Sequence, residues 1–317
     1  MLEIDKIHCG DSLELLKQID DKSIQCQICS PPYLNMRSYL PDNHESKNKE
    51  FGCHSTPEEY VEKLYTYFDE VYRVLKDDGV CFINLGDTYL GSGKGVWKGK
   101  EGAHKEGFKF QEKQKEILSG WRCPKQLALI PSRFAIYMQE KNWILRNKII
   151  WYRPNAIPSS VKDRFTVDYE EIFMFVKNPQ YKFNIQYEPY TKPMNRWGGE
   201  KLIAREDTKS TWDNGTGQST YRTRNMRPNP NGKQKRSVWT INTKPLKSAH
   251  CAIFPEALVE PMILSGTNEG DLVLDIFSGT GTTCLVAKKN NRNYLGLELG
   301  QKYCEIANKR LNYAYNE

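Results

Sequence analysis

The sequence contains no hydrophobic segment long enough to cross a membrane. Its apolar runs, such as residues 149–151 and 272–274, are far shorter than the roughly 20 residues that a transmembrane helix needs. Residues 1–6 include acidic side chains and lack the apolar core of a signal peptide. The nine cysteines are scattered and odd in number, which argues against a complete disulfide framework. We therefore expect a protein of the reducing cytoplasm.

Complete patterns for a zinc site or a P-loop are also missing. Cys26 and Cys29 have the spacing of a zinc half-site, but no second cysteine pair follows at a suitable spacing. Both fall within an apolar stretch, so packing in the core is the favoured interpretation and we expect no metal. The glycine-rich stretch 91–95 has Gly95 where a P-loop requires Ser or Thr.

Positive charge is present in modest excess. The chain has 317 residues and a net charge of +7, with 27% charged and 38% hydrophobic residues. This composition suits a soluble α/β protein with one large domain, alone or with an insertion. Between residues 190 and 247, basic side chains outnumber acidic ones by roughly three to one, and large aromatics lie among them, including Trp197, Trp212, Tyr221 and Trp239. The region suits contact with a polyanion, although a merely solvated basic face has the same composition.

The first part of the chain alternates strands and helices. The pattern predicts strands at 4–7, 24–28 and 80–85, and helices at 13–19 and from 56 to 77–79. Asp11 or Ser12 can cap the first helix, and Thr56, Pro57 and Glu59 form a strong start for the second. A β-α-β-α-β order implies a parallel sheet.

The rest of the chain continues the pattern with interruptions. We expect helices near 132–141, 256–266, 284–289 and 303–313, and strands at 143–151, 171–176, 272–277 and 294–298. Residues 34–54 and 88–120 are polar or glycine-rich without periodicity, which predicts flexible loops. Residues 153–160 form a polar, conformationally restricted loop of the kind that carries function on a rigid scaffold.

Two turns follow predicted strands and combine polar groups with special backbone residues. The first is Ser30-Pro31-Pro32-Tyr33, in which two prolines end the strand and leave a hydroxyl and an aromatic ring beside free carbonyls. The second runs from Asp275 to Thr283 and contains Gly279 and Gly281, with Glu298 ending the next strand. Glycines there let the backbone approach a ligand, and an acidic residue at such a position can bond ribose hydroxyls. Alone, the second turn has a purely structural alternative.

Together the two turns resemble those of the S-adenosylmethionine-dependent amino methyltransferases of DNA. The catalytic motif of that family is Asp/Asn/Ser-Pro-Pro-Tyr/Phe/Trp, and its cofactor motif resembles the sequence from Asp275 to Thr283. The catalytic motif comes first in this chain, which is the order of the β class. The resemblance implies an α/β Rossmann-like methyltransferase fold with circularly permuted motif order and a mostly parallel sheet. It also implies a catalytic half at 1–180, an inserted target-recognition region at 181–246 and a cofactor-binding half at 247–317.

The same resemblance assigns roles to residues. The expected catalytic residues are Ser30, Pro31, Pro32 and Tyr33. The expected cofactor-binding residues are Asp11, His250, Phe254, Pro255, Asp275, Phe277, Ser278, Gly279, Gly281, Thr282, Thr283 and Glu298, although a structural role for His250 is as well supported. The expected DNA-binding residues are Arg222, Arg224, Arg227, Lys233, Lys235 and Arg236.

Ser30 bears on the target base. In this family Ser-Pro-Pro-Tyr is most typical of cytosine-N4 enzymes and Asp-Pro-Pro-Tyr of adenine-N6 enzymes, which favours cytosine. The resemblance implies a flipped base, S-adenosylmethionine as cofactor and double-stranded DNA as partner, with a separate restriction endonuclease and a monomeric or homodimeric state as further expectations. Methylation of RNA or of a protein glutamine, and a DNA-binding module without catalysis, remain alternatives.

Overall fold

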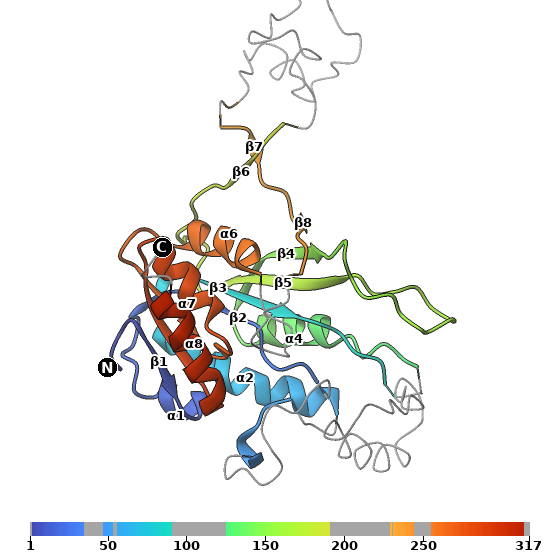
Figure 1. Ribbon diagram of the computed structural model, residues 1–317, viewed down its shortest axis with the longest axis horizontal. Coiled ribbons are helices and arrows are strands. Elements are labelled where there is room, and N and C mark those ends of the chain that lie inside the picture. The colour runs from blue at the N-terminus through green and yellow to red at the C-terminus, as the bar shows by residue number, and fades with distance from the viewer. Residues whose placement is uncertain are drawn as a thin grey trace, which may run out of the picture. The chain divides into compact units, whose positions relative to one another are not determined.

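The structure, a computed structural model, describes residues 2–34, 47–52, 56–90, 125–190, 229, 231–243 and 255–313 (Figure 1). The chain divides into two compact units, one of Met1–Asn184 with Ser237–Glu317 and one of Ile185–Arg236. The smaller unit is narrower than the predicted insertion at 181–246. Residues on both flanks belong to the large unit, because Asn184 bonds the end of a helix there and residues 238–240 pair with its sheet. The role of the insertion in target recognition stays a prediction.

The large unit is built on one sheet, which has eight strands in the described residues. Their order is β1 (Lys6–Cys9), β10 (Asn293–Glu298), β9 (Leu272–Asp275), β2 (Ile24–Cys29), β3 (Leu75–Leu85), β5 (Tyr169–Val176), β4 (Ile144–Tyr152) and β8 (Val238–Thr240). Every neighbouring pair is parallel except the two that include β5. The predicted mostly parallel, Rossmann-like sheet is therefore confirmed.

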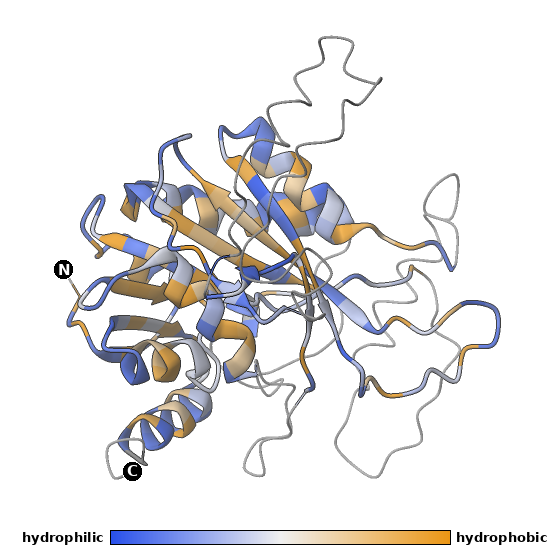
Figure 2. Cartoon of the chain, turned by 90° about the horizontal axis from the view of Figure 1, so that it is seen from above, coloured by the Kyte–Doolittle hydropathy of each residue, from blue (hydrophilic) through white to orange (hydrophobic). Residues whose placement is uncertain are grey.

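Helices cover both faces of this sheet, and much of the sheet is hydrophobic (Figure 2). One face packs against α1 (Ser12–Leu16), α2 (Pro57–Val74) and α4 (Ile130–Glu140). The other packs against α6 (Glu256–Gly266), α7 (Thr282–Lys289) and α8 (Gln301–Tyr313). The strands supply both cores by alternation: Cys81 and Ile83 of β3 face the first set of helices, and Val80 and Phe82 face the second.

The same alternation decides whether Cys26 and Cys29 of β2 could form a zinc half-site. Cys26 belongs to the core beneath α6 and α7, whereas Cys29 belongs to the core on the opposite face. Two side chains on opposite faces of a strand cannot bind one metal ion, so core packing is confirmed as their role. All six cysteines in the described residues are free thiols.

Helix α2 begins as predicted and ends earlier. Thr56 Oγ1 accepts a hydrogen bond of 3.1 Å from the Glu59 N–H, and Pro57 occupies the first helical turn. The predicted end at 77–79 is wrong, because the helix stops at Val74 and Leu75 already pairs with Ile24 of β2. The register then shifts before Val80 pairs with Cys26. Buried Leu75 thus belongs to the sheet rather than to the helix.

The described residues of two predicted loops include buried side chains. In the range 34–54, Leu34 and Phe51 are buried, and residues Lys47–Lys49 form the short helix η1. In the range 88–120, the Leu90 N–H donates to the Gln126 carbonyl at 2.8 Å, and Leu90 is buried. These residues pack against the large unit, and the predicted flexibility of the two loops stays a prediction. Residues 35–46, 53–54 and 91–120 lie outside the described residues.

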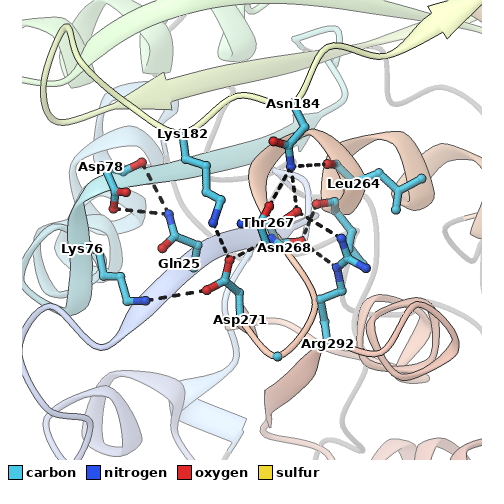
Figure 3. A network of polar contacts seen from close by, with 12 residues as sticks. Gln25, Lys76, Asp78, Lys182, Asn184, Leu264, Thr267, Asn268, Asp271 and Arg292 are labelled. Atoms are coloured by element: carbon cyan, nitrogen blue, oxygen red, sulfur yellow. Dashed lines mark hydrogen bonds and ion pairs between the residues drawn. The ribbon is translucent and has the colours of Figure 1, made fainter. Parts of the chain in front are cut away.

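The amino-terminal edge of the sheet is closed by a polar network (Figure 3). Lys182 Nζ lies 2.9 Å from Asp271 Oδ2, and Lys76 Nζ lies 3.8 Å from Asp271 Oδ1. The Asn184 amide donates to the carbonyls of Leu264 and Thr267 at 3.1 and 2.9 Å. These contacts hold residues 182–184 against the loop before β9. The polar groups at this edge of the sheet therefore bond one another and stabilise the fold.

The smaller unit, described by itself, contains the antiparallel strands β6 (Tyr187–Glu188) and β7 (Lys233–Gln234). Gly232 precedes β7 with φ +107°, and a Cβ there would lie 2.4 Å from the Glu188 carbonyl oxygen. Glycine is therefore required at this turn. In the described parts of both units, no helix is long and apolar enough to cross a membrane.

Candidate active site

The two turns of interest leave the sheet at the same edge. Strands β2 and β9 are parallel neighbours, with Cys26 opposite Val273 and Gln27 opposite Leu274. Their carboxyl ends therefore lie side by side. The chain then passes from β9 to β10 on one side and from β2 to β3 on the other. Such a point of divergence is where open α/β sheets bind ligands.

The turn after β9 is held by the carboxylates of Asp275, which is buried, and Glu298, which is half-buried. Asp275 Oδ1 accepts from the Phe277 N–H at 3.0 Å, and burial raises the pKa of Asp275 to about 7 against the opposing effect of the Thr283 hydroxyl and that N–H. Glu298 accepts from the N–H groups of Gly279 and Gly300 at 2.8 Å each. Burial also raises the pKa of Glu298, and these backbone donors oppose the rise.

The two glycines of this turn have different reasons to be glycine. Gly281 has φ +75°, and a Cβ there would lie 2.9 Å from Ala307 of α8 and 3.0 Å from Ile7 of β1. Gly279 has φ +50°, and its Cβ would meet nothing nearer than the Phe277 carbonyl at 4.0 Å. Packing within the protein therefore requires Gly281, whereas Gly279 borders open space.

Several hydroxyl groups surround the turn. Ser278 Oγ is buried and has no hydrogen-bond partner in the described residues. The Thr282 hydroxyl accepts from Arg310 of α8 at 3.0 Å, and the same guanidinium bonds the Thr280 carbonyl at 2.6 Å. Thr282 thus has a structural partner, while Ser278 has a free polar atom at the turn.

Asp11 is brought to this turn by the neighbouring strands. The Gly10 N–H donates to the Glu298 carbonyl at 2.8 Å, and Ser12 Oγ donates to the Ile276 carbonyl at 2.7 Å. Between them, one oxygen of Asp11 caps α1 by accepting from the Leu13 N–H. The sequence predicted this cap as Asp11 or Ser12, and Asp11 is the residue that makes it.

Aromatic side chains adjoin the same place. The Phe277 ring centroid lies 5.9 Å from that of Phe51 and 5.2 Å from that of Tyr67 on α2. Burial, with the charge of Asp11, raises the pKa of Tyr67 to about 12. Phe51 and Tyr67 were not identified from the sequence, because the first fell in a predicted loop and the second has the spacing of an ordinary core residue.

These residues fit a nucleoside cofactor such as S-adenosylmethionine. Glu298 has lone pairs beyond its two backbone bonds for ribose hydroxyls, and Asp11 has a second carboxylate oxygen for an adenine amino group. The open space beside Gly279 is what a turn that receives a ligand would show.

The turn after β2 is packed tightly on its own side. Tyr60 of α2 donates its hydroxyl to the Pro32 carbonyl at 3.0 Å, which fixes the second proline. A Cβ on Gly86, the residue after β3, would lie 2.5 Å from the ring of Tyr33. Gly86 therefore makes room for the ring, a role that the sequence did not reveal.

The hydroxyl of Tyr33 is the centre of a polar cluster. It accepts from Ser30 Oγ at 3.2 Å and from the Asn84 amide at 2.7 Å, and it donates to Glu170 Oε2 at 2.5 Å. The other oxygen of Glu170 accepts from Arg153 at 2.9 Å. Burial, together with the charge of Glu170, raises the pKa of Tyr33 well above its ordinary value. The phenol is therefore neutral.

The partners of Tyr33 had weak signals in the sequence. Asn84 is a polar residue at the end of an apolar strand, Arg153 begins the loop expected to carry function, and Glu170 directly precedes the predicted strand at 171–176. Only the order of the strands brings them together, because they belong to β3, the end of β4 and β5.

Four of the remaining predicted site residues lie in the described part of the chain. Pro255 is the N-cap residue of α6. Lys233 and Arg236 of the smaller unit pair with Glu188, with shortest separations of 3.3 and 2.7 Å, and the Lys235 N–H donates to the Gln186 carbonyl. His250, Phe254, Arg222, Arg224 and Arg227 lie outside the described residues. The cofactor and DNA roles of all these residues stay predictions.

A fold with two motif turns at one sheet edge defines a class of nucleotide-binding transferase, and comparison with known proteins gives the family. The model of the DNA methylase family, N6_N4_Mtase, matches residues 24–309, so the chain belongs to that family. The family expected from the sequence is confirmed.

Among curated proteins, the chain is similar to the type II methyltransferase M.Cfr9I of Citrobacter freundii. The two are 34% identical over 302 residues, which is 95% of this chain and 86% of the relative. M.SmaI of Serratia marcescens is 31% identical over 307 residues, covering 96% and 90% of the two chains.

Among solved structures, the PvuII DNA methyltransferase (cytosine-N4-specific) has a TM-score of 0.61 at 21% identity, covering 98% of this chain and 90% of that one. TTHA0409 from Thermus thermophilus, a putative DNA modification methylase solved with S-adenosyl-L-methionine, has a TM-score of 0.55 at 20% identity, covering 98% and 95%. At this identity the similarity supports the fold.

Proposed function

We propose that this DNA methylase transfers the methyl group of S-adenosylmethionine to the exocyclic N4 of cytosine in duplex DNA. The observation that carries the proposal is the position of Ser30-Pro31-Pro32-Tyr33 at the end of β2, directly beside the cofactor turn at the end of β9. A methyl donor in one turn and an amine in the other would meet at the carboxyl edge of the sheet. Protection of DNA in a restriction–modification system is the biological role that fits this activity.

The chemistry follows from what the β2 turn offers. The amine of a nucleobase is a poor nucleophile because its lone pair is delocalised into the ring. Ser30 Oγ and the Pro31 carbonyl would accept its two N–H groups and favour a pyramidal nitrogen whose lone pair points at the donor. Bound S-adenosylmethionine supplies a methyl group that its sulfonium already makes reactive. The protein then contributes mainly by positioning the amine and the methyl donor.

The target base has to leave the duplex to reach this turn. An exocyclic amine cannot be approached in line within the base stack, so the base is flipped out and held by stacking. Tyr33 is the residue we assign to that stacking. Its ring is fixed at one end by the hydroxyl bonds to Asn84 and Glu170 and along its edge by Gly86.

Cytosine is favoured over adenine by the Ser30 side chain, which is the typical first residue of the motif in cytosine-N4 enzymes. Adenine N6 is the second candidate, because the matching family model covers both N6 and N4 methylases by its name. Duplex DNA incubated with the enzyme and isotope-labelled cofactor, digested and analysed by mass spectrometry, should yield labelled N4-methylcytosine. Labelled N6-methyladenine would overturn the base assignment and leave the class of enzyme unchanged.

The role of Ser30 has its own test. Ser30→Ala removes one of the two acceptors, so we expect the single-turnover rate constant of methyl transfer to fall by about 10²-fold, because misplacing the reacting atoms has effects of that size. The affinity for cofactor, measured by calorimetry, should remain close to that of the wild type. An unchanged rate constant would refute the role given to this hydroxyl.

A competition experiment separates duplex DNA from RNA as the target. An added RNA substrate should not inhibit methylation of duplex DNA.

A further inference from the structure

Three oxygen atoms form a continuous hydrogen-bonded line from the catalytic turn into the protein. Ser30 Oγ donates to Tyr33 Oη at 3.2 Å, and Tyr33 Oη donates to Glu170 Oε2 at 2.5 Å. Ser30 and Tyr33 follow β2, whereas Glu170 belongs to β5, two strands further along the sheet. The line therefore starts at the atom assigned to the substrate amine and ends at a carboxylate.

The neighbouring donors set the direction of this line. The Asn84 amide nitrogen donates to both Tyr33 Oη and Glu170 Oε2 at 2.7 Å, and Arg153 donates to Glu170 Oε1 at 2.9 Å. Because Asn84 occupies Tyr33 Oη as a donor, the phenolic hydrogen points toward Glu170. The Ser30 hydrogen then points toward Tyr33. The Asn84 amide also donates to Ser30 Oγ, at 3.4 Å, and the other lone pair of Ser30 is left for the N–H of a base.

We propose that Tyr33 and Glu170 carry away the proton that the target amine loses when it is methylated. The proposal rests on the role of Ser30 given above. As the N–C bond forms and the S–C bond breaks, the nitrogen gives a proton to Ser30 Oγ. Ser30 passes its own hydrogen to Tyr33 Oη, and Tyr33 passes its hydrogen to Glu170. The products are S-adenosylhomocysteine, the methylated base and a protonated Glu170, which returns its proton to water between turnovers.

The electrostatics of the cluster suit a transfer of this kind. Burial and the charge of Glu170 keep the pKa of Tyr33 well above its ordinary value, so the phenol passes a proton on without persisting as a phenolate. Two ionisable groups bond Glu170: Tyr33 beyond β2, and Arg153 beyond β4, which holds the carboxylate from its other oxygen. Asn84, from β3, is neutral. Since the family motif also accepts Phe or Trp at the fourth position, this relay is a particular property of chains with Tyr there.

Two variants interrupt the hydrogen-bonded line from Ser30 to Glu170. They keep the aromatic ring of Tyr33 and the shape of the Glu170 side chain. Tyr33→Phe keeps the stacking surface, and Glu170→Gln keeps an acceptor oxygen while losing the capacity to hold a proton as a carboxylate does. We expect each to lower the single-turnover rate constant at neutral pH by about 10²-fold, the lower range of general-base effects. The variant rate constants should rise with pH, because hydroxide replaces the relay, while the wild-type rate constant stays level.

A matched control separates proton transfer from loosening of the turn. Tyr60→Phe also removes one phenolic hydroxyl bonded to this turn, at the Pro32 carbonyl, and lies outside the line. It should have a smaller effect that does not depend on pH. Base flipping, measured with a fluorescent base analogue at the target position, and cofactor affinity, measured by calorimetry, should be retained in Tyr33→Phe and Glu170→Gln.

The outcomes distinguish the relay from the function on which it rests. If Ser30→Ala slows transfer while Tyr33→Phe and Glu170→Gln match the wild type across the pH range, the relay is wrong and the role of Ser30 stands. If Ser30→Ala is also without effect, the proposed chemistry of the turn fails. If the two relay variants lose base flipping together with rate and show no dependence on pH, Glu170 only positions the ring of Tyr33, and the relay is likewise wrong.

Discussion

Asp275 shows how a single buried side chain can couple the cofactor turn to pH. It is 3% exposed, and burial raises its pKa from 3.8 to about 7. The folded state therefore favours the protonated carboxyl more than the unfolded chain does. The neutral carboxyl therefore makes its full contribution to the free energy of unfolding below about pH 4. This contribution is lost as the pH rises through about 7.

Asp275→Asn should remove this dependence. The amide keeps an oxygen for the Phe277 N–H and has no charge to bury, so we expect the variant to be more stable than the wild type at pH 8 and similar at pH 4. The difference at pH 8 is at most about 4 kcal/mol, from about 1.4 kcal/mol per unit of pKa. Urea unfolding of the cofactor-free protein at several pH values measures it. Parallel stability curves for the two proteins would show that Asp275 is ionised in the fold without cost.

At the same scale, the sequence predicted the residues of the two turns but not their partners. Ser30, Asp275 and Glu298 follow apolar strands, so local pattern was enough to mark them. Asn84 and Glu170 meet Tyr33 only because β3 and β5 are neighbours in the sheet. No local pattern encodes an antiparallel strand inserted between parallel ones, so these contacts could not be predicted.

Among the elements, the βα turn between β9 and α7 combines two requirements that look identical in sequence. Gly281 is confined by Ala307 and Ile7, so its missing side chain serves the packing of α8 and β1. Gly279 borders open space, so its missing side chain is left to serve the ligand. Both have positive φ, which costs an alanine about 1–2 kcal/mol by itself.

Substitution should separate these two requirements. Gly279→Ala should lower the free energy of unfolding by about 1–2 kcal/mol and raise the cofactor dissociation constant at least about tenfold, because the methyl group enters the space for the ligand. Gly281→Ala should cost more stability, since strain at its φ adds to overpacking of about 1–3 kcal/mol. Chemical denaturation and calorimetry check both values. Equal losses of stability with unchanged cofactor binding would contradict the assignment of Gly279.

The predicted elements succeeded where a helix cap or a strong period marked them. The Thr56 cap of α2 agrees with the structure because its signal is local, and the predicted bounds of α6, 256–266, agree as well. The predicted boundary between α2 and β3 is wrong, since Asp77, Asp78 and Gly79 have the composition of a helix end and instead lie within an irregular strand, where the two aspartates are exposed and Gly79 is buried. There, pairing of Leu75 with β2 decides the structure, and that pairing is not local.

For the whole molecule, the net charge of +7 bears on how the protein contacts DNA. The β6–β7 strand pair of the smaller unit, with the described residues that flank it, carries Lys233, Lys235 and Arg236 against the single acidic residue Glu188. Cations that contact phosphates release counterions, so each contact adds about 0.9 to the slope of log affinity against log salt concentration. Loss of a contact to the DNA backbone weakens binding to all sequences alike, whereas loss of a contact to a base edge changes the sequence preference.

We expect a variant with Lys233→Gln, Lys235→Gln and Arg236→Gln to bind duplex DNA more weakly and with a slope smaller by about 2–3, if all three reach phosphates. Fluorescence anisotropy over a range of salt concentrations measures the slope, and calorimetry should give an unchanged affinity for the cofactor. The matched control removes three exposed lysines that are also ion-paired, Lys17, Lys22 and Lys63 of the large unit, by the same change to Gln. The control has the same loss of net charge, so equal slopes for the two variants would show that only total charge matters. An unchanged slope in the Lys233, Lys235 and Arg236 variant would remove the β6–β7 strand pair from the DNA interface and leave recognition to other parts of the chain.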